Sequence, residues 1–181
     1  VAISPGLVSI NDYIDEYGIN HGKGIPVGKA VWAPVNCGYH MTDYKYGKLY
    51  QWGRKYGQGY SGPMYDINGS NVGSVSDATT PEVEEGGISA ITGNHINNAN
   101  IFYLQSPDNS DWTEPQDPMM WNSGTDEKPI KTDYDPCPSG WRVPTYEELT
   151  SLCSNNSSPW LEDESGQLGR WYSGIYLFDD A

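Results

Sequence analysis

Residues 135–149 read Asp135-Pro136-Cys137-Pro138-Ser139-Gly140-Trp141-Arg142-Val143-Pro144-Thr145-Tyr146-Glu147-Glu148-Leu149. Pro136 and Pro138 restrict the backbone on both sides of Cys137, because the proline ring fixes its own φ angle. Gly140 permits a turn conformation that other residues resist. The first half of this stretch therefore predicts a rigid turn that holds a cysteine.

The middle of the stretch has the period of a short strand. Trp141 and Val143 alternate with Arg142, and Pro144 ends the alternation. We expect the Trp141 side chain to be buried and the Arg142 guanidinium to pair with a carboxylate or with loop carbonyls.

The end of the stretch predicts the start of a helix. Thr145 and Glu148 have the spacing of a capping box, in which each side chain accepts a hydrogen bond from the other residue's backbone N–H. Leu149, Leu152 and Cys153 are predicted to share the apolar face of this helix. The whole stretch thus predicts a fixed strand-to-helix junction.

Four further motifs accompany this junction, at residues 32–38 (Trp-Ala-Pro-Val-Asn-Cys-Gly), 46–54 (Tyr-Gly-Lys-Leu-Tyr-Gln-Trp-Gly-Arg), 121–124 (Trp-Asn-Ser-Gly) and 171–174 (Trp-Tyr-Ser-Gly). Together with the junction they resemble the Fibrobacter succinogenes major paralogous domain, which occurs in surface and pilus-tip proteins of Bacteroidetes. The resemblance covers roughly residues 30–175.

This resemblance implies a C-type-lectin-like fold, related to formylglycine-generating enzymes and to diversity-generating variable proteins. The expected architecture is α+β and loop-rich, with small antiparallel sheets and one or two short helices. The expected location is extracellular, at the bacterial cell surface. The residues expected to build the scaffold are Trp32, Trp52, Cys137, Trp141 and Arg142.

The chain contains three cysteines, Cys37, Cys137 and Cys153, so at least one has no internal disulfide partner. Cys137 is the best disulfide candidate. In the family that the chain resembles, a later Arg-Cys-Val strand would supply its partner. The domain predicted for residues 30–181 would then lack the C-terminal portion of the family domain.

The composition favours a loop-rich domain whose core contains more tryptophan and tyrosine than phenylalanine, with 7 Trp and 14 Tyr against 2 Phe, and with 21 Gly and 13 Pro. The net charge of −14 would repel nucleic acids and anionic membranes. No apolar run approaches the roughly 20 residues that a membrane span requires. We therefore expect neither nucleic-acid binding nor membrane insertion.

Residues 1–29 are interpreted as an entry segment that would follow other domains of a longer parent chain. Ser9 is predicted to cap a short helix that ends at Gly18, with an apolar stripe that includes Tyr13 and Ile14. The Gly- and Pro-rich residues 22–28 are predicted to form a linker.

In the domain itself, residues 30–33 and 48–52 are predicted to form two strands of one sheet, with a polar-aromatic loop at residues 39–46 between them. A long surface loop is expected over residues 57–100, and a short strand over residues 101–104. Two more loops are expected at residues 106–118 and 154–169, and a last strand at residues 170–173.

Metal sites are weakly indicated. Residues 66–71 with Asp77 echo a calcium loop, but they lack its glycine at position six and its glutamate at position twelve, and ordinary turns have the same composition. The acidic run of Glu82, Glu84 and Glu85 is interpreted as a solvated loop. The histidines lack the spacing of metal ligands; they are His21, His40 and His95. We predict no cofactor, with calcium as the alternative.

Catalytic residues are also weakly indicated. Glu147 and Glu148 could act as paired carboxylates, but the first turn of a helix favours acidic residues for structural reasons. Cys37 could act as a nucleophile with His40 as its base. An oxidase like the formylglycine-generating enzymes would need a copper-binding cysteine pair in its C-terminal half, and the sequence shows no such pair.

Three tryptophans lie in or beside polar loops, namely Trp112, Trp121 and Trp160. Such rings can stack on sugars or anchor a protein partner, although a role in covering the core is favoured for each. The resulting prediction is a non-catalytic recognition module, an adhesin or pilus-tip domain that binds a glycan or a host or bacterial surface protein. The alternatives are a structural pilus subunit completed by a donated strand and a formylglycine-generating-enzyme-like oxidase.

Overall fold

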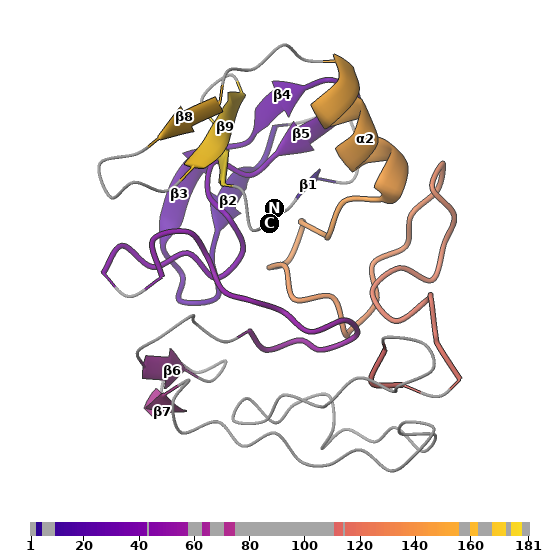
Figure 1. The fold of residues 1–181 in the computed structure, drawn as a ribbon, viewed down its shortest axis with the longest axis horizontal. Helices are drawn as coiled ribbons and strands as arrows, with labels where there is room; N and C mark the ends of the chain where they lie inside the picture. The colour runs from indigo at the N-terminus through magenta and orange to yellow at the C-terminus, as the bar shows by residue number, and fades with distance from the viewer. Residues whose placement is uncertain are drawn as a thin grey trace.

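The structure is a computed structural model that describes residues 10–57 except 43, residues 111–155 except 114, and the backbone of several strands outside these ranges (Figure 1). The described part has an α+β architecture. Its elements are β1 (Ile3–Ser4), β2 (Asp12–Ile14), β3 (Asn20–Lys23), β4 (Ile25–Val27), β5 (Ala30–Trp32), β6 (Pro63–Tyr65), β7 (Asn71–Ser74), α2 (Tyr146–Asn155), β8 (Trp160–Glu162), β9 (Leu168–Tyr172) and β10 (Ile175–Phe178).

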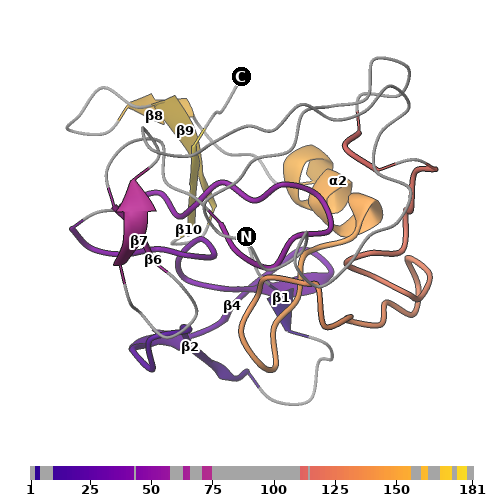
Figure 2. The same ribbon diagram turned by 90° about the horizontal axis from the view of Figure 1, so that it is seen from below.

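The strands form small antiparallel sheets, as predicted. Two sheets have three strands each, in the orders β1-β5-β4 and β10-β9-β8, and β2-β3 and β6-β7 are two-stranded. Helix α2 lies against the β1-β5-β4 sheet, and the β6-β7 hairpin lies on the opposite side of the molecule in both views (Figures 1 and 2).

The predicted helix before Gly18 is wrong, because residues 12–14 form strand β2. The Tyr13 side chain is buried whereas Ile14 is 49% exposed, which is the alternation of a strand. The Asp15 carboxylate then accepts the backbone N–H groups of Tyr17 and Ile19, each at 2.9 Å, and closes a turn. Ser9 lies outside the described residues.

The predicted linker at residues 22–28 is also wrong, because it contains the end of β3 and the whole of β4. Strand β4 is at the edge of its sheet, where the missing N–H of Pro26 is tolerated. Gly24 is required for packing, since a Cβ atom there would lie 2.5 Å from Val31 Cγ1 and 2.7 Å from the Trp141 ring. These residues therefore belong to the packed structure.

Of the two strands predicted for one sheet, the first is confirmed as β5, and the second is wrong. Residues 48–52 form no strand, and the chain turns where the Arg54 N–H donates to the Gln51 carbonyl at 3.0 Å. The bulky residues whose alternation predicted a strand contact different parts of the chain: the Tyr50 hydroxyl lies near the Cys37 sulfur, and the Trp52 indole donates to the Asp117 carbonyl.

The remaining predictions are met in part. Residues 111–118, apart from 114, lie in a loop, and the last predicted strand overlaps β9. The hairpin of β6 and β7 interrupts the long loop predicted for residues 57–100. The rest of that loop and the strand predicted at residues 101–104 lie outside the described residues.

The Trp141 cluster is one of two core clusters among the described residues, and it confirms the predicted burial of this side chain. Trp141 is 1% exposed, its indole N–H donates to the Asp12 carbonyl at 3.2 Å, and its ring meets Tyr13 edge-on at 5.3 Å. The cluster comprises Tyr13, Val31, Ala33, Cys37, Cys137 and Trp141. It joins the N-terminal strands to the proline-flanked cysteine.

A second cluster packs helix α2 against the β1-β5-β4 sheet. Leu152 packs with Val27, Ala30 and Trp32, and the Trp32 indole N–H donates to the Val27 carbonyl at 3.0 Å. The predicted apolar face is only partly correct. Leu149 is 42% exposed and Cys153 is exposed, because the buried side of the helix runs through Leu152.

The predicted capping box is confirmed. The Thr145 N–H donates to Glu148 Oε2 at 2.8 Å, and the Glu148 N–H donates to Thr145 Oγ1 at 3.3 Å. The Glu148 carboxylate also accepts hydrogen bonds from both terminal nitrogens of Arg142, at 2.9 and 2.7 Å, which confirms the predicted carboxylate partner. One carboxylate thus fixes both the helix start and the arginine before it.

Replacing Glu148 with alanine should lower the free energy of unfolding by about 2–3 kcal/mol, because a buried arginine loses its charged partner and the helix loses a cap. Denaturant unfolding of the purified chain measures the loss. The exposed neighbour Glu147 provides the control, and Glu147→Ala should change stability by no more than about 0.5 kcal/mol. Equal effects of the two substitutions would contradict the role given to Glu148.

Candidate functional site

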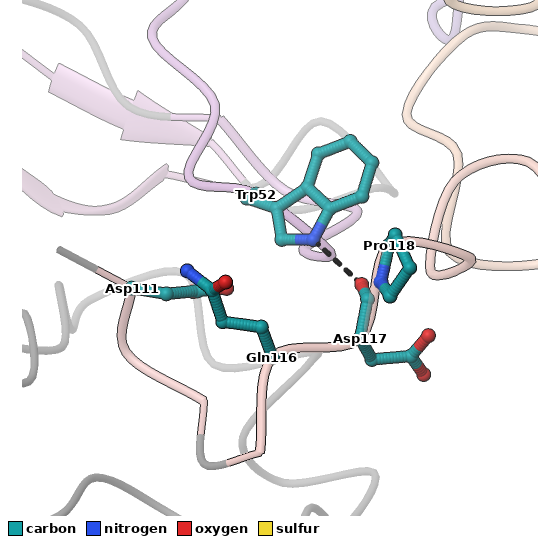
Figure 3. Close-up of a pocket in the computed structure, with 5 residues that line it drawn as sticks. All are labelled: Trp52, Asp111, Gln116, Asp117 and Pro118. Atoms are coloured by element: carbon teal, nitrogen blue, oxygen red, sulfur yellow. Dashed lines mark hydrogen bonds between the residues drawn. The ribbon is translucent and has the colours of Figure 1, made fainter. Parts of the chain in front are cut away.

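A pocket of about 510 Å³ opens between the turn at Trp52 and the loop at residues 111–118. Its lining residues are Trp52, Asp111, Gln116, Asp117 and Pro118 (Figure 3). The volume lies within the roughly 300–1,000 Å³ that is usual for small-molecule sites. The pocket is therefore large enough for a monosaccharide or a side chain of a partner.

Three contacts hold Trp52, two of them at its ring. The indole N–H donates to the Asp117 carbonyl at 3.0 Å (Figure 3), and the Trp52 backbone carbonyl accepts the Trp112 indole N–H at 2.7 Å. The Trp121 ring packs edge-on against the Trp52 ring at a centroid distance of 4.7 Å. Since the polar atom of Trp52 is already used in the scaffold, the ring offers the pocket an apolar surface.

The backbone next to this ring is also constrained. Gly53 has a φ of +72°, and a Cβ atom at this position would collide with the Met120 side chain. A residue with a side chain would therefore be disfavoured both by conformation and by space. This close approach joins the Trp52 turn to the loop that carries the other pocket residues.

The opposite wall is polar and acidic. Asp117 Oδ1 accepts the Met119 N–H at 2.9 Å, and Asp111 accepts the Trp112 N–H at 2.7 Å and the Thr113 hydroxyl at 3.1 Å. These bonds fix the loop, and Gln116 reaches from it toward the space below the Trp52 ring (Figure 3). An amide near a carboxylate, here Gln116 and Asp111, can hydrogen-bond hydroxyl groups, and the negative charge repels anions.

The predicted site residues lie in different parts of the structure. Trp52, predicted as scaffold, also lines the pocket. Trp112 is 1% exposed and lies inside the protein, and Trp121 is half-buried behind Trp52. Trp160 begins β8, and its side chain is outside the described part of the chain. The polar loop that contains Trp112 was the only sequence signal for Asp111, Gln116 and Asp117.

The proposed Cys37 nucleophile has other neighbours than its predicted base. Its sulfur lies 3.4 Å from the Tyr50 hydroxyl and 3.5 Å from the Pro136 carbonyl. His40 Nδ1 accepts the Thr42 N–H at 3.4 Å. His21 pairs instead with the buried Asp15 carboxylate at 2.7 Å, and His95 lies outside the described residues.

Among the described residues, no group of three or more His, Cys, Asp or Glu side chains is arranged to hold a metal ion. The acidic run at residues 82–85 and most of the calcium-like segment lie outside those residues. Asn71 of that segment begins β7.

Comparison of the chain with protein-family models, curated proteins and solved structures finds no match. In the described portion of the chain, no helix has the length and apolar character needed to cross a membrane.

Proposed function

We propose that this chain is a non-catalytic recognition module of C-type-lectin-like fold, an extracellular adhesin or pilus-tip domain of the bacterial surface. It binds a glycan in the Trp52 pocket. The observation that carries the proposal is the juxtaposition of a fixed indole ring with the side chains of Gln116 and Asp111 and with the backbone of Asp117 around a pocket of about 510 Å³ (Figure 3).

The pocket suits a sugar for two reasons. An indole ring packs against the apolar face of a pyranose, whereas amide and carboxylate oxygens accept hydrogen bonds from its hydroxyl groups. The two aspartates in the lining and the net charge of −14 favour a neutral or basic saccharide over an anionic one.

The fold supports the same proposal. The described chain combines small antiparallel sheets with one helix and long irregular segments, and the pocket is made from two such segments. A rigid scaffold that presents loops is the usual arrangement of a binding site. A protein partner that inserts one side chain into the pocket is the alternative ligand.

The proposal is tested by screening the purified chain on a glycan array and measuring the best neutral ligand by calorimetry. Gln116→Ala should weaken binding about tenfold through a lost hydrogen bond, and Trp52→Ala by roughly thirtyfold or more. The matched control is Tyr146→Ala, which removes an aromatic ring that is 80% exposed and outside the pocket lining.

The control should bind like the unmodified chain. Circular dichroism establishes that each variant is folded before binding is measured. A chain that binds no glycan, or whose affinity is unchanged by Gln116→Ala and Trp52→Ala, would overturn the proposal.

A further inference from the structure

Two cysteines that are distant in the sequence meet in the Trp141 cluster. Cys37 and Cys137 are 6% and 5% exposed and belong to the same group of buried residues. The Cys37 sulfur lies 3.5 Å from the carbonyl oxygen of Pro136, 99 residues along the chain and directly before Cys137. Both thiols are reduced in this structure.

The backbone at each cysteine is held in place. The Cys37 carbonyl accepts the Lys48 N–H at 3.1 Å. At the other cysteine, the Cys137 N–H donates to Asp135 Oδ1 at 2.8 Å, and the Cys137 carbonyl accepts the Lys131 ammonium at 2.7 Å. Because disulfides tolerate little error in the positions of their Cα and Cβ atoms, neighbouring thiols on fixed backbones are well prepared for a bond.

We propose that Cys37 and Cys137 form an intramolecular disulfide when the folding chain meets a low-molecular-weight disulfide as oxidant. The Cys37 thiolate attacks the oxidant, and one thiol of the oxidant leaves. Cys137 then gives up its proton and attacks the Cys37 sulfur of the mixed disulfide, and the second thiol of the oxidant leaves. The two cysteines lose two electrons and two protons, and the oxidant becomes two thiols.

This pairing differs from the later cysteine that the family resemblance implies as the partner of Cys137. It leaves the exposed Cys153 as the free thiol among the three cysteines. Because both paired thiols are nearly inaccessible in the folded chain, Cys37 reacts with the oxidant before the Trp141 cluster closes, and the closing cluster then brings Cys137 to the Cys37 sulfur of the mixed disulfide.

The test is to refold the chain with glutathione disulfide, unfold it without reductant, label free thiols with N-ethylmaleimide and map the peptides by mass spectrometry. The expected result is a linked pair of peptides that contain Cys37 and Cys137, with the label on Cys153 alone. Labels on all three cysteines, or a link through Cys153, would overturn the proposal.

A stability measurement tests for the disulfide without replacing either buried cysteine. Adding reductant to the oxidised chain should lower its melting temperature by on the order of 10 °C, because the bond closes a loop of about 100 residues. The control variant Cys153→Ser should show the same shift. A melting temperature that does not respond to reductant would contradict the bond.

Discussion

Replacing Trp141 with alanine should lower the free energy of unfolding by about 3–5 kcal/mol, the usual cost of truncating a buried large aromatic residue. The ring is 1% exposed, meets Tyr13 edge-on and lies close enough to Gly24 to exclude a side chain there. Its indole N–H also satisfies the Asp12 carbonyl. Truncation would leave a cavity in the Trp141 cluster and would remove the hydrogen bond to the Asp12 carbonyl.

Urea unfolding followed by circular dichroism measures this loss, and Tyr146→Ala is the aromatic control because Tyr146 is 80% exposed. The control should stay within about 0.5 kcal/mol of the unmodified chain. If Trp141→Ala does not fold, Trp141→Phe provides a smaller truncation of the same site. A Trp141→Ala chain that melts within a degree or two of the unmodified protein would remove Trp141 from the centre of the fold.

Replacing Asp135 with alanine should cost a comparable amount, about 3–5 kcal/mol. Its carboxylate is buried and accepts the N–H groups of Cys137 and Val143, each at 2.8 Å, and the Lys131 ammonium at 2.6 Å. Without the carboxylate, two backbone donors and one charged group lose their partner together.

Asp133→Ala is the matched control, since Asp133 is an exposed aspartate two residues earlier. Its effect should stay within about 0.5 kcal/mol. Asp135→Asn separates charge from shape, and it should be less damaging than Asp135→Ala because one amide oxygen can still accept a hydrogen bond. Equal stability of Asp133→Ala and Asp135→Ala would show that the buried carboxylate does not organise the junction.

The parts of the fold that the sequence predicts correctly depend on local interactions. The capping box needs only Thr145 and Glu148, three residues apart, and the glutamate partner of Arg142 lies six residues away. Strand β5 is short and apolar throughout, so its burial can be predicted without knowing its partner strands.

The wrong predictions involve segments whose conformation depends on distant residues. Tyr13 and Ile14 fit a helical stripe as well as they fit a strand, and what decides between them is the Trp141 ring, far along the chain. The same ring explains why Gly24 marks close packing, although glycine and proline at residues 22–28 are equally typical of a linker.

The candidate site follows the same rule. The sequence singles out Trp52 as an important aromatic residue, but its pocket exists only because the loop at residues 111–118 returns to it. The hydrogen bond that joins them connects residues 65 positions apart. No spacing within either segment indicates this contact, so the sequence alone could not combine them into one site.

The bond between the Trp141 indole and the Asp12 carbonyl spans 129 residues and has a consequence for biosynthesis. During translation, the apolar surface of Tyr13 stays uncovered until Trp141 has left the ribosome, and that of Trp32 until Leu152 has. Bringing such distant segments together is entropically costly and slow. The nascent chain is therefore prone to aggregation while these 129 residues are synthesised, and its yield should depend on chaperones that bind unfolded chains.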